Sequence, residues 1–269
     1  MGGDCSVKKK KTDLLFLFPS LAGMLLFFVV PFGACLYYAC TDNAFSGKFA
    51  GGTNFRALLN NEFFRLAAAN TVKFLLCAVP AAVVGSFLLA LLLARFGKRL
   101  TVLRSAFFLP VMLPSAAVVL FWNAYCTRCA EELPFFSLVV LFLWKYAGLD
   151  VMLFLTALTG VDRDTLDAAR IDGASPVRVV VSVLLPQITP TLFFVLILTV
   201  TNALRIHRES YLLYGSYPSE DVYMLGNYLG NHFAKLNYQN IGAAAVMTAA
   251  VMAVGTALLW HLGRRETGS

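Results

Sequence analysis

Apolar residues are gathered in six long blocks along this chain, and short polar segments separate the blocks. A helix that spans the hydrocarbon core of a bilayer needs about 20 mostly apolar residues, and each block is close to that length. We therefore predict an all-α polytopic membrane protein with a single domain over residues 1–269. The six expected spanning helices are Leu14–Ala39, Ala67–Ala94, Leu103–Tyr125, Phe135–Leu158, Gln187–Leu204 and Ile241–Leu262.

The first block follows four consecutive lysines, Lys8–Lys11, as the apolar part of a secretory signal peptide also does. The apolar part of a signal peptide is only about 7–15 residues long, whereas this block extends over roughly 26. We interpret it as a spanning helix that is retained.

Composition supports the membrane assignment and gives an orientation. Hydrophobic residues make up 59% of the chain and charged residues 14%, against about 45–50% and about 25% in soluble domains. Basic residues stay on the cytoplasmic side of a membrane. With the N-terminus inside, 13 of the 22 basic residues lie in inner segments and 7 in outer ones. We expect both termini in the cytoplasm, and we interpret the net charge of +7 as topology information rather than as nucleic-acid binding.

A charged segment interrupts the apolar pattern between the fourth and fifth blocks, within residues 159–185. It carries seven charged residues, namely Asp162, Arg163, Asp164, Asp167, Arg170, Asp172 and Arg178. One charge at the bilayer centre costs about 2.5–3.5 kcal/mol on insertion scales, so this segment must lie largely outside the membrane. The orientation places it in the cytoplasm.

The same segment has the signals of two short helices. Asp164 or Thr165 can cap the first helix, and Gly173 can end it in a left-handed turn. Ser175 can cap the second, with Pro176 at its first position. One interpretation is an amphipathic connector that floats at the interface. Ala168 and Ala169 argue against it, because small residues on an exposed helix let a partner approach closely and anchor weakly in lipid.

This segment resembles the EAA loop of bacterial ABC importer permeases, which has the pattern E-A-A-x3-G-x9-I-x-L-P. Here Asp167, Ala168 and Ala169 are followed after three residues by Gly173, and nine residues later by the sequence V-L-L-P that ends at Pro186. Asp replaces Glu and Val replaces Ile. Other stretches, including RESYLLYGSYP at 208–218 and LNYQNIGAAA at 236–245, resemble the carbohydrate branch related to the maltose and glycerol-3-phosphate permeases. The segment at 126–134 is shorter than is typical of that branch.

The resemblance implies a mechanism and a set of partners. The loop would form a coupling helix seated on a cytoplasmic ATPase, and closure of two ATPase copies would turn the cavity from inward- to outward-facing. The complex would also contain a second permease subunit, a related but different chain, and an extracytoplasmic solute-binding protein. The residues carried over for ATPase coupling are Asp167, Ala168, Ala169, Gly173, Ser175, Pro176 and Pro186.

No triphosphate site is expected in this chain. A P-loop reads G-x-x-x-x-G-K-[ST], and the only Gly-Lys pairs, at 47–48 and 97–98, lack the upstream glycine and the following hydroxyl residue. ATP and Mg²⁺ would therefore be bound by the partner ATPase, and we expect no cofactor, metal or catalytic group here. We interpret the C-x2-C of Cys126 and Cys129 as two unlinked cysteines rather than a local disulfide.

Ionisable residues at membrane depth are functional candidates. Lys145 lies about eleven residues into the fourth block, and Asp150 follows it on another face of the helix. They can line the substrate path, or they can be structural charges matched by neighbouring helices. The fifth block and its outer end supply further donors and acceptors suited to a hydroxyl-rich ligand, namely Asn202, Arg205, Glu209 and Tyr211.

Two other classes compete with an ATP-driven sugar importer. An autonomous secondary transporter or channel would make the charged segment a mere connector, but such transporters usually contain internal repeats, and the sequence has no visible duplication. A membrane-embedded enzyme would need a cluster of acids or histidines at membrane depth, which the sequence does not offer.

Overall fold

The computed structural model describes residues 17–42, 47–95 and 101–267. Within these ranges five helices are long and apolar enough to cross a bilayer, and a sixth is counted when one bent pair is taken as a single span. The regular structure of the described part is helical, apart from one isolated bridge between Thr41 and Phe49. The all-α polytopic fold is confirmed.

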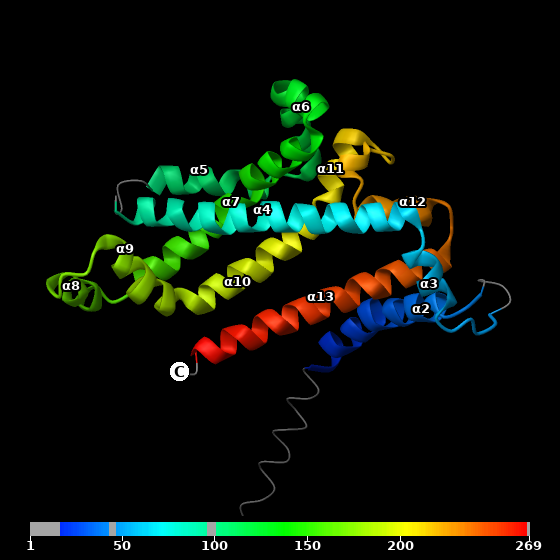
Figure 1. The fold of residues 1–269 in the computed structure, drawn as a ribbon, viewed down its shortest axis with the longest axis horizontal. Coiled ribbons are helices and arrows are strands. Elements are labelled where there is room, and N and C mark those ends of the chain that lie inside the picture. The colour runs from blue at the N-terminus through cyan, green and yellow to red at the C-terminus, as the bar shows by residue number, and fades with distance from the viewer. Residues whose placement is uncertain (1–16, 43–46, 96–100, 268–269) are drawn as a thin grey trace, which may run out of the picture. The chain divides into compact units, whose positions relative to one another are not determined.

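The spans lie over the predicted segments (Figure 1), and most begin and end within a few residues of the predicted bounds; the helical run of the fifth begins earlier, at Pro176 rather than Gln187. They are residues 17–39, which contain η1 (Leu25–Val29) and α2 (Val30–Ala39); α4 (Glu62–Arg95); the bent pair α5 (Thr101–Met112) and α6 (Ser115–Glu132); α7 (Pro134–Gly160); the run of α9 (Pro176–Val179), η3 (Val180–Leu184) and α10 (Leu185–Leu204); and α13 (Tyr238–Thr267). The shorter helices are α3 (Thr53–Leu59), α8 (Arg163–Ile171), α11 (His207–Tyr214), η4 (Glu220–Val222) and α12 (Leu225–Ala234).

The third span differs from its prediction. The sequence pattern predicts one helix over Leu103–Tyr125, whereas the structure has two helices bent by 113° at residues 113–114. Proline causes the break. Pro114 has no amide proton to continue the helix, and its ring disfavours the helical conformation at the preceding Leu113. The Leu113 amide instead donates to the carbonyl of Pro110 at 3.3 Å, as in a tight last turn.

The chain divides into two compact units, so a single domain over the whole chain stays a prediction. One unit comprises residues 1–61 with 231–251, and the other 62–230 with 252–269. In the first, Tyr38 of α2 stacks on Tyr238 of α13 with ring centroids 5.4 Å apart. Gly242 lies so close to α2 that a Cβ there would be 2.5 Å from the Cys35 carbonyl oxygen.

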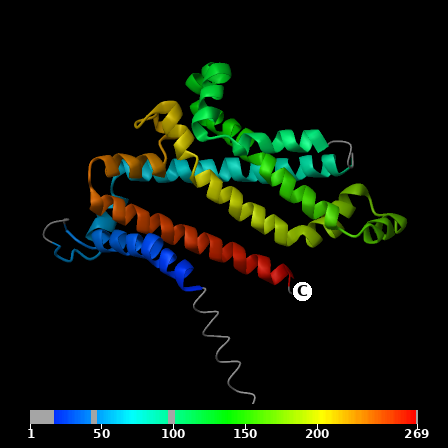
Figure 2. The same ribbon diagram turned by 180° about the vertical axis from the view of Figure 1, so that it is seen from behind.

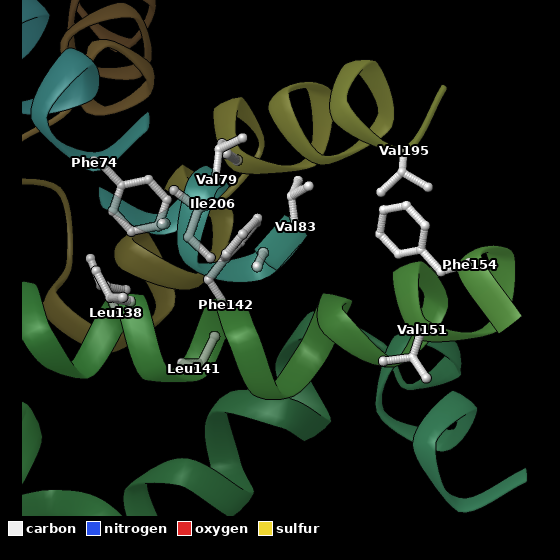
Figure 3. Close-up of a cluster of buried hydrophobic side chains, with 14 of the residues drawn as sticks. Phe74, Val79, Val83, Leu138, Leu141, Phe142, Val151, Phe154, Val195 and Ile206 are labelled. Carbon is white, nitrogen blue, oxygen red and sulfur yellow. The ribbon is translucent and has the colours of Figure 1, made fainter. Parts of the chain in front are cut away.

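The larger unit is built around α7, the most buried of the candidate spans. It contacts α4, α5, α6 and α10 (Figures 1 and 2). The face of α4 that packs in this unit repeats every three or four residues, at positions such as Phe74, Ala78 and Ala82, which is the spacing of one side of a helix. Figure 3 shows the resulting core, where Phe74 and Val79 of α4, Phe142 of α7 and Ile206 gather between the helices.

Candidate functional site

The charged segment folds as the helix–turn–helix α8–α9 between α7 and α10. Asp162 caps α8: its backbone is extended, and its carboxylate accepts from the Asp164 amide at 3.3 Å. The predicted caps, Asp164 and Thr165, are therefore wrong by a few residues, because both already lie inside the first helical turn. Ser175 caps α9 as predicted, with its Oγ accepting from the Arg178 amide at 3.4 Å and Pro176 at the helix start.

Gly173 makes the turn between the two helices with φ +80°, in the left-handed region. Its amide donates to the Arg170 carbonyl at 3.0 Å, and the Ala174 amide donates to the Ala169 carbonyl at 3.0 Å. These two bonds form a Schellman motif, which satisfies carbonyls at the end of a helix. The left-handed turn predicted from the sequence is confirmed.

The outer surface of this segment has polar and apolar parts. Asp167 and Arg170 form an exposed ion pair at 2.9 Å, next to the exposed Ala168. Two large apolar side chains also face solvent, since Ile171 is 86% exposed and Val177 is 72% exposed. An exposed ion pair contributes little to stability, and apolar side chains in water cost free energy. The surface of this segment therefore combines an exposed ion pair with exposed apolar side chains.

The segment is continuous with the fifth span. The run α9–η3–α10 continues without a break past Pro186, which lies in the first turn of α10. No loop therefore separates α9 from α10. Val179 and Leu184 of this run are buried, and Leu184 belongs to the core of the larger unit.

Lys145 is at the centre of a buried polar cluster formed by three helices. The Lys145 ammonium forms an ion pair with Oε1 of Glu209 on α11, and the two side chains are only 5% and 1% exposed. Ser115, the first residue of α6, donates to the same Glu209 oxygen at 2.7 Å and accepts from Lys145 at 3.0 Å. The pair corresponds to the second interpretation of Lys145, a charge matched by a neighbouring element. Within the described residues, Glu209 Oε2 has no hydrogen-bond partner.

Asp150 is buried elsewhere on α7 and meets Thr199 of α10. Asp150 Oδ2 lies 2.9 Å from the Thr199 hydroxyl, which is also 2.7 Å from the Val195 carbonyl oxygen. The Thr199 hydroxyl is the donor in both contacts, and its single proton is shared between the Asp150 carboxyl oxygen and the Val195 carbonyl oxygen. Among the described side chains no cation pairs with Asp150.

The residues predicted for the substrate path therefore do not form one cluster. Asn202 is buried in α10, whereas Arg205, directly after α10, and Tyr211 of α11 are exposed, Tyr211 by 53%. Sequence reasoning missed Ser115 and Thr199, the partners of the buried charges. The available signal was weak, because a lone hydroxyl residue in an apolar helix usually bonds its own backbone.

No three His, Cys, Asp or Glu side chains come together as a metal site requires in the part of the chain that the structure describes. Cys126 is a free cysteine at a kink in α6, where its φ of −124° departs from the helix.

Comparison with known proteins adds the family context. The family model described as "Binding-protein-dependent transport system inner membrane component" matches residues 12–262. The arabinooligosaccharides transport system permease protein AraP of Bacillus subtilis is 26% identical, over 90% of this chain and 84% of that protein. The sn-glycerol-3-phosphate transport system permease protein UgpA of Pectobacterium atrosepticum is also 26% identical, over 70% of this chain and 72% of its own length.

Two solved structures have the same fold. One is a bacterial ABC transporter involved in the import of the acidic polysaccharide alginate, with a TM-score of 0.78 and 20% identity over 97% of both chains. The other is a bacterial alginate ABC transporter in complex with an alginate pentasaccharide-bound periplasmic protein. It has a TM-score of 0.80 and 19% identity, over 97% of this chain and 96% of that one.

Proposed function

This chain belongs to the family of binding-protein-dependent transport system inner membrane components, and we propose that it is the permease subunit of an ATP-driven importer for a sugar or oligosaccharide. The observation that carries the coupling role is the exposed helix–turn–helix α8–α9, held by two caps and a Schellman turn and continuous with α10. The sugar class is supported by relatives such as AraP, whose name specifies arabinooligosaccharides.

In this proposal α8 and α9 dock on a cytoplasmic ABC ATPase. Ala168 and Ala169 allow close approach, and Asp167 supplies a polar contact once it exchanges its exposed partner Arg170 for a group on the ATPase. Ile171 and Val177 then leave water, since about 25 cal/mol is gained for each Å² of apolar surface that is buried. Gly173, Ser175 and Pro176 keep the two short helices at a fixed angle, and Pro186 lies in the first turn of α10, the helix that carries the motion onward.

The remaining partners follow from the same family. We expect a second, related permease chain, two copies of the ATPase, a solute-binding protein on the outer side and surrounding lipid. ATP and Mg²⁺ belong to the ATPase chains. The orientation predicted from basic residues puts both termini and the α8–α9 segment in the cytoplasm.

For the substrate path we propose Arg205 and Tyr211, which are exposed at the outer end of the fifth span. A guanidinium group and a phenol ring can donate to sugar hydroxyls and stack on the apolar face of a sugar ring. Lys145, Glu209, Asp150 and Asn202, although predicted with them, are buried in this conformation. They reach a substrate only if alternating access exposes them.

The decisive experiment is purification of the tagged chain in mild detergent, followed by mass spectrometry of the chains that co-purify and by uptake assays on the reconstituted complex. We expect an ABC ATPase and a second permease, and ATP-dependent uptake of arabinotriose or of another oligosaccharide in a panel. Uptake by this chain alone, without an ATPase, would favour the autonomous transporter instead.

A further inference from the structure

We propose that Lys145, Glu209 and Ser115, hereafter the outer clamp, position α11 and make it the outer anchor of the helix that the ATPase moves. The role assigned to the clamp rests on the proposed function, in which α8–α9 receives the ATPase. The clamp residues act on the geometry of transport without contacting the substrate.

The clamp joins elements that are far apart in the sequence. Ser115 begins α6 directly after the break of the third span, Lys145 is in the middle of α7, and Glu209 is in the first turn of α11. Lys145 and Ser115 both bond to one oxygen, Glu209 Oε1, and also to each other. A buried pair of this kind is weak evidence for stability, and its best-attested role is to fix which elements pack together and in which register.

The next residue along α11 extends the attachment. The Ser210 hydroxyl donates to the Val222 carbonyl at 3.4 Å, so α11 holds the η4 segment that follows it. That segment is tied in turn to α4, where the Asn70 amide donates to the Tyr223 carbonyl at 3.0 Å and Thr71 Oγ1 accepts from the Leu225 amide at 3.0 Å. The outer segment from α11 to residue 225 is therefore bonded to α4, α6 and α7.

These bonds determine which helices must move when α10 moves. The helical run from Pro176 to Leu204 has α8–α9 at one end, and only Arg205 and Ile206 separate its other end from α11. Ile206 is 1% exposed, so this short connection is itself packed in the core. Because α11 is fixed at Glu209, a push on α9 must carry α6 and α7 with it or break the clamp. With an intact clamp, α6, α7 and α11 move together when ATP binds to the ATPase.

The clamp predicts a specific pattern among neutralising variants. Lys145→Met alone leaves the Glu209 carboxylate buried without its cation, and Glu209→Gln alone leaves the ammonium without its anion. Both single variants should lose thermal stability and most of the ATP-dependent change at α11, because one unpaired buried charge remains. The double variant Lys145→Met with Glu209→Leu removes both charges. It should regain most of the thermal stability and of the ATP-dependent change that the single variants lose. Glu220→Gln removes an exposed acid from the same outer loop and is the matched control.

Two measurements test this, and neither needs the substrate to be known. The first is the thermal unfolding of the purified chain. The second is maleimide labelling of a cysteine placed at Leu212 of α11, on a background without the six native cysteines. Labelling is compared in the nucleotide-free and ATP-bound complex. We expect ATP to change the labelling rate in the parent protein and in Glu220→Gln, and the single variants to reduce that change by about 2- to 30-fold, the range of typical coupling effects.

The outcomes separate this inference from the proposed function. If no ATPase co-purifies, the proposed function fails, while unfolding still reports whether the two charges are coupled. Additive losses of thermal stability in the double variant would overturn the clamp. So would single variants that keep a normal ATP-dependent change at residue 212, or a double variant that regains stability but not that change. If the single variants fail to insert, Ser115→Ala removes one bond of the clamp and should weaken the ATP-dependent change; a normal change would count against the proposal.

Discussion

Gly148 gives the sharpest quantitative prediction, because α5 passes closer to α7 at this residue than any side chain allows. A Cβ built on Gly148 would lie 1.7 Å from the Phe107 carbonyl oxygen and 2.6 Å from its carbonyl carbon. Real Cβ atoms essentially never approach another heavy atom within 3.0 Å. In Gly148→Ala, α5 must therefore move away from α7 by at least about 1.3 Å, and the obstacle is a backbone atom that cannot rotate aside.

The free-energy cost of this overpacking is partly offset by the higher helix preference of alanine. Overpacking of a well-packed site costs about 1–3 kcal/mol, and the helix preference of alanine over glycine returns about 1 kcal/mol. Gly148→Ala should therefore be destabilised by up to about 2 kcal/mol. Gly85→Ala, in the adjoining helix α4, has nothing within 4 Å of the new Cβ and should be stabilised by up to about 1 kcal/mol. The two substitutions are chemically identical, and their changes in the free energy of unfolding should have opposite signs.

The measurement is equilibrium unfolding of the purified protein in detergent, with the parent, Gly148→Ala and Gly85→Ala side by side. Uptake by the reconstituted complex is measured in parallel, because the shift of α5 also moves the break that begins α6. A Gly148→Ala protein as stable as Gly85→Ala would show that α5 does not approach α7 so closely, and the packing argument would be wrong.

Three further predictions concern the coupling segment and the buried acid. Gly173→Val should cost about 1–2 kcal/mol locally, because a side chain is strained at φ +80°, and the inserted protein should capture its ATPase poorly in a co-purification assay; normal capture would reduce α8–α9 to a connector. Asp150→Asn, which keeps an oxygen that accepts from Thr199, should transport normally while Asp150→Leu does not, and a loss in Asp150→Asn would show that the charge is needed. A cysteine at Ser175 should be labelled only from the cytoplasmic side, and labelling from outside would invert the topology.

The local features of this chain were predictable because local sequence determines them. Apolar length set the spans, so α4, α7 and α10 begin and end within a few residues of their predicted bounds. The turn at Gly173 and the cap at Ser175 depend on residues no more than five positions away. The break of the third span also has a local cause, Pro114. The apolar pattern continues across this residue, however, and predicts one helix. Hydrophobicity decides what enters the membrane, but it does not show that the backbone breaks at Pro114.

The buried cluster is the part that only tertiary structure decided. The sequence marked Lys145 as a charge at membrane depth and left open whether it lines a path or is matched by a neighbouring helix, and it offered Glu209 only as a ligand contact. Ser115, Lys145 and Glu209 are separated by 30 and 64 positions along the chain, and no helical periodicity relates residues on different helices. They meet because α6 turns at Pro114 and α11 returns after α10. A buried charge must find a counter-charge, but which one it finds is determined by the packing of whole helices.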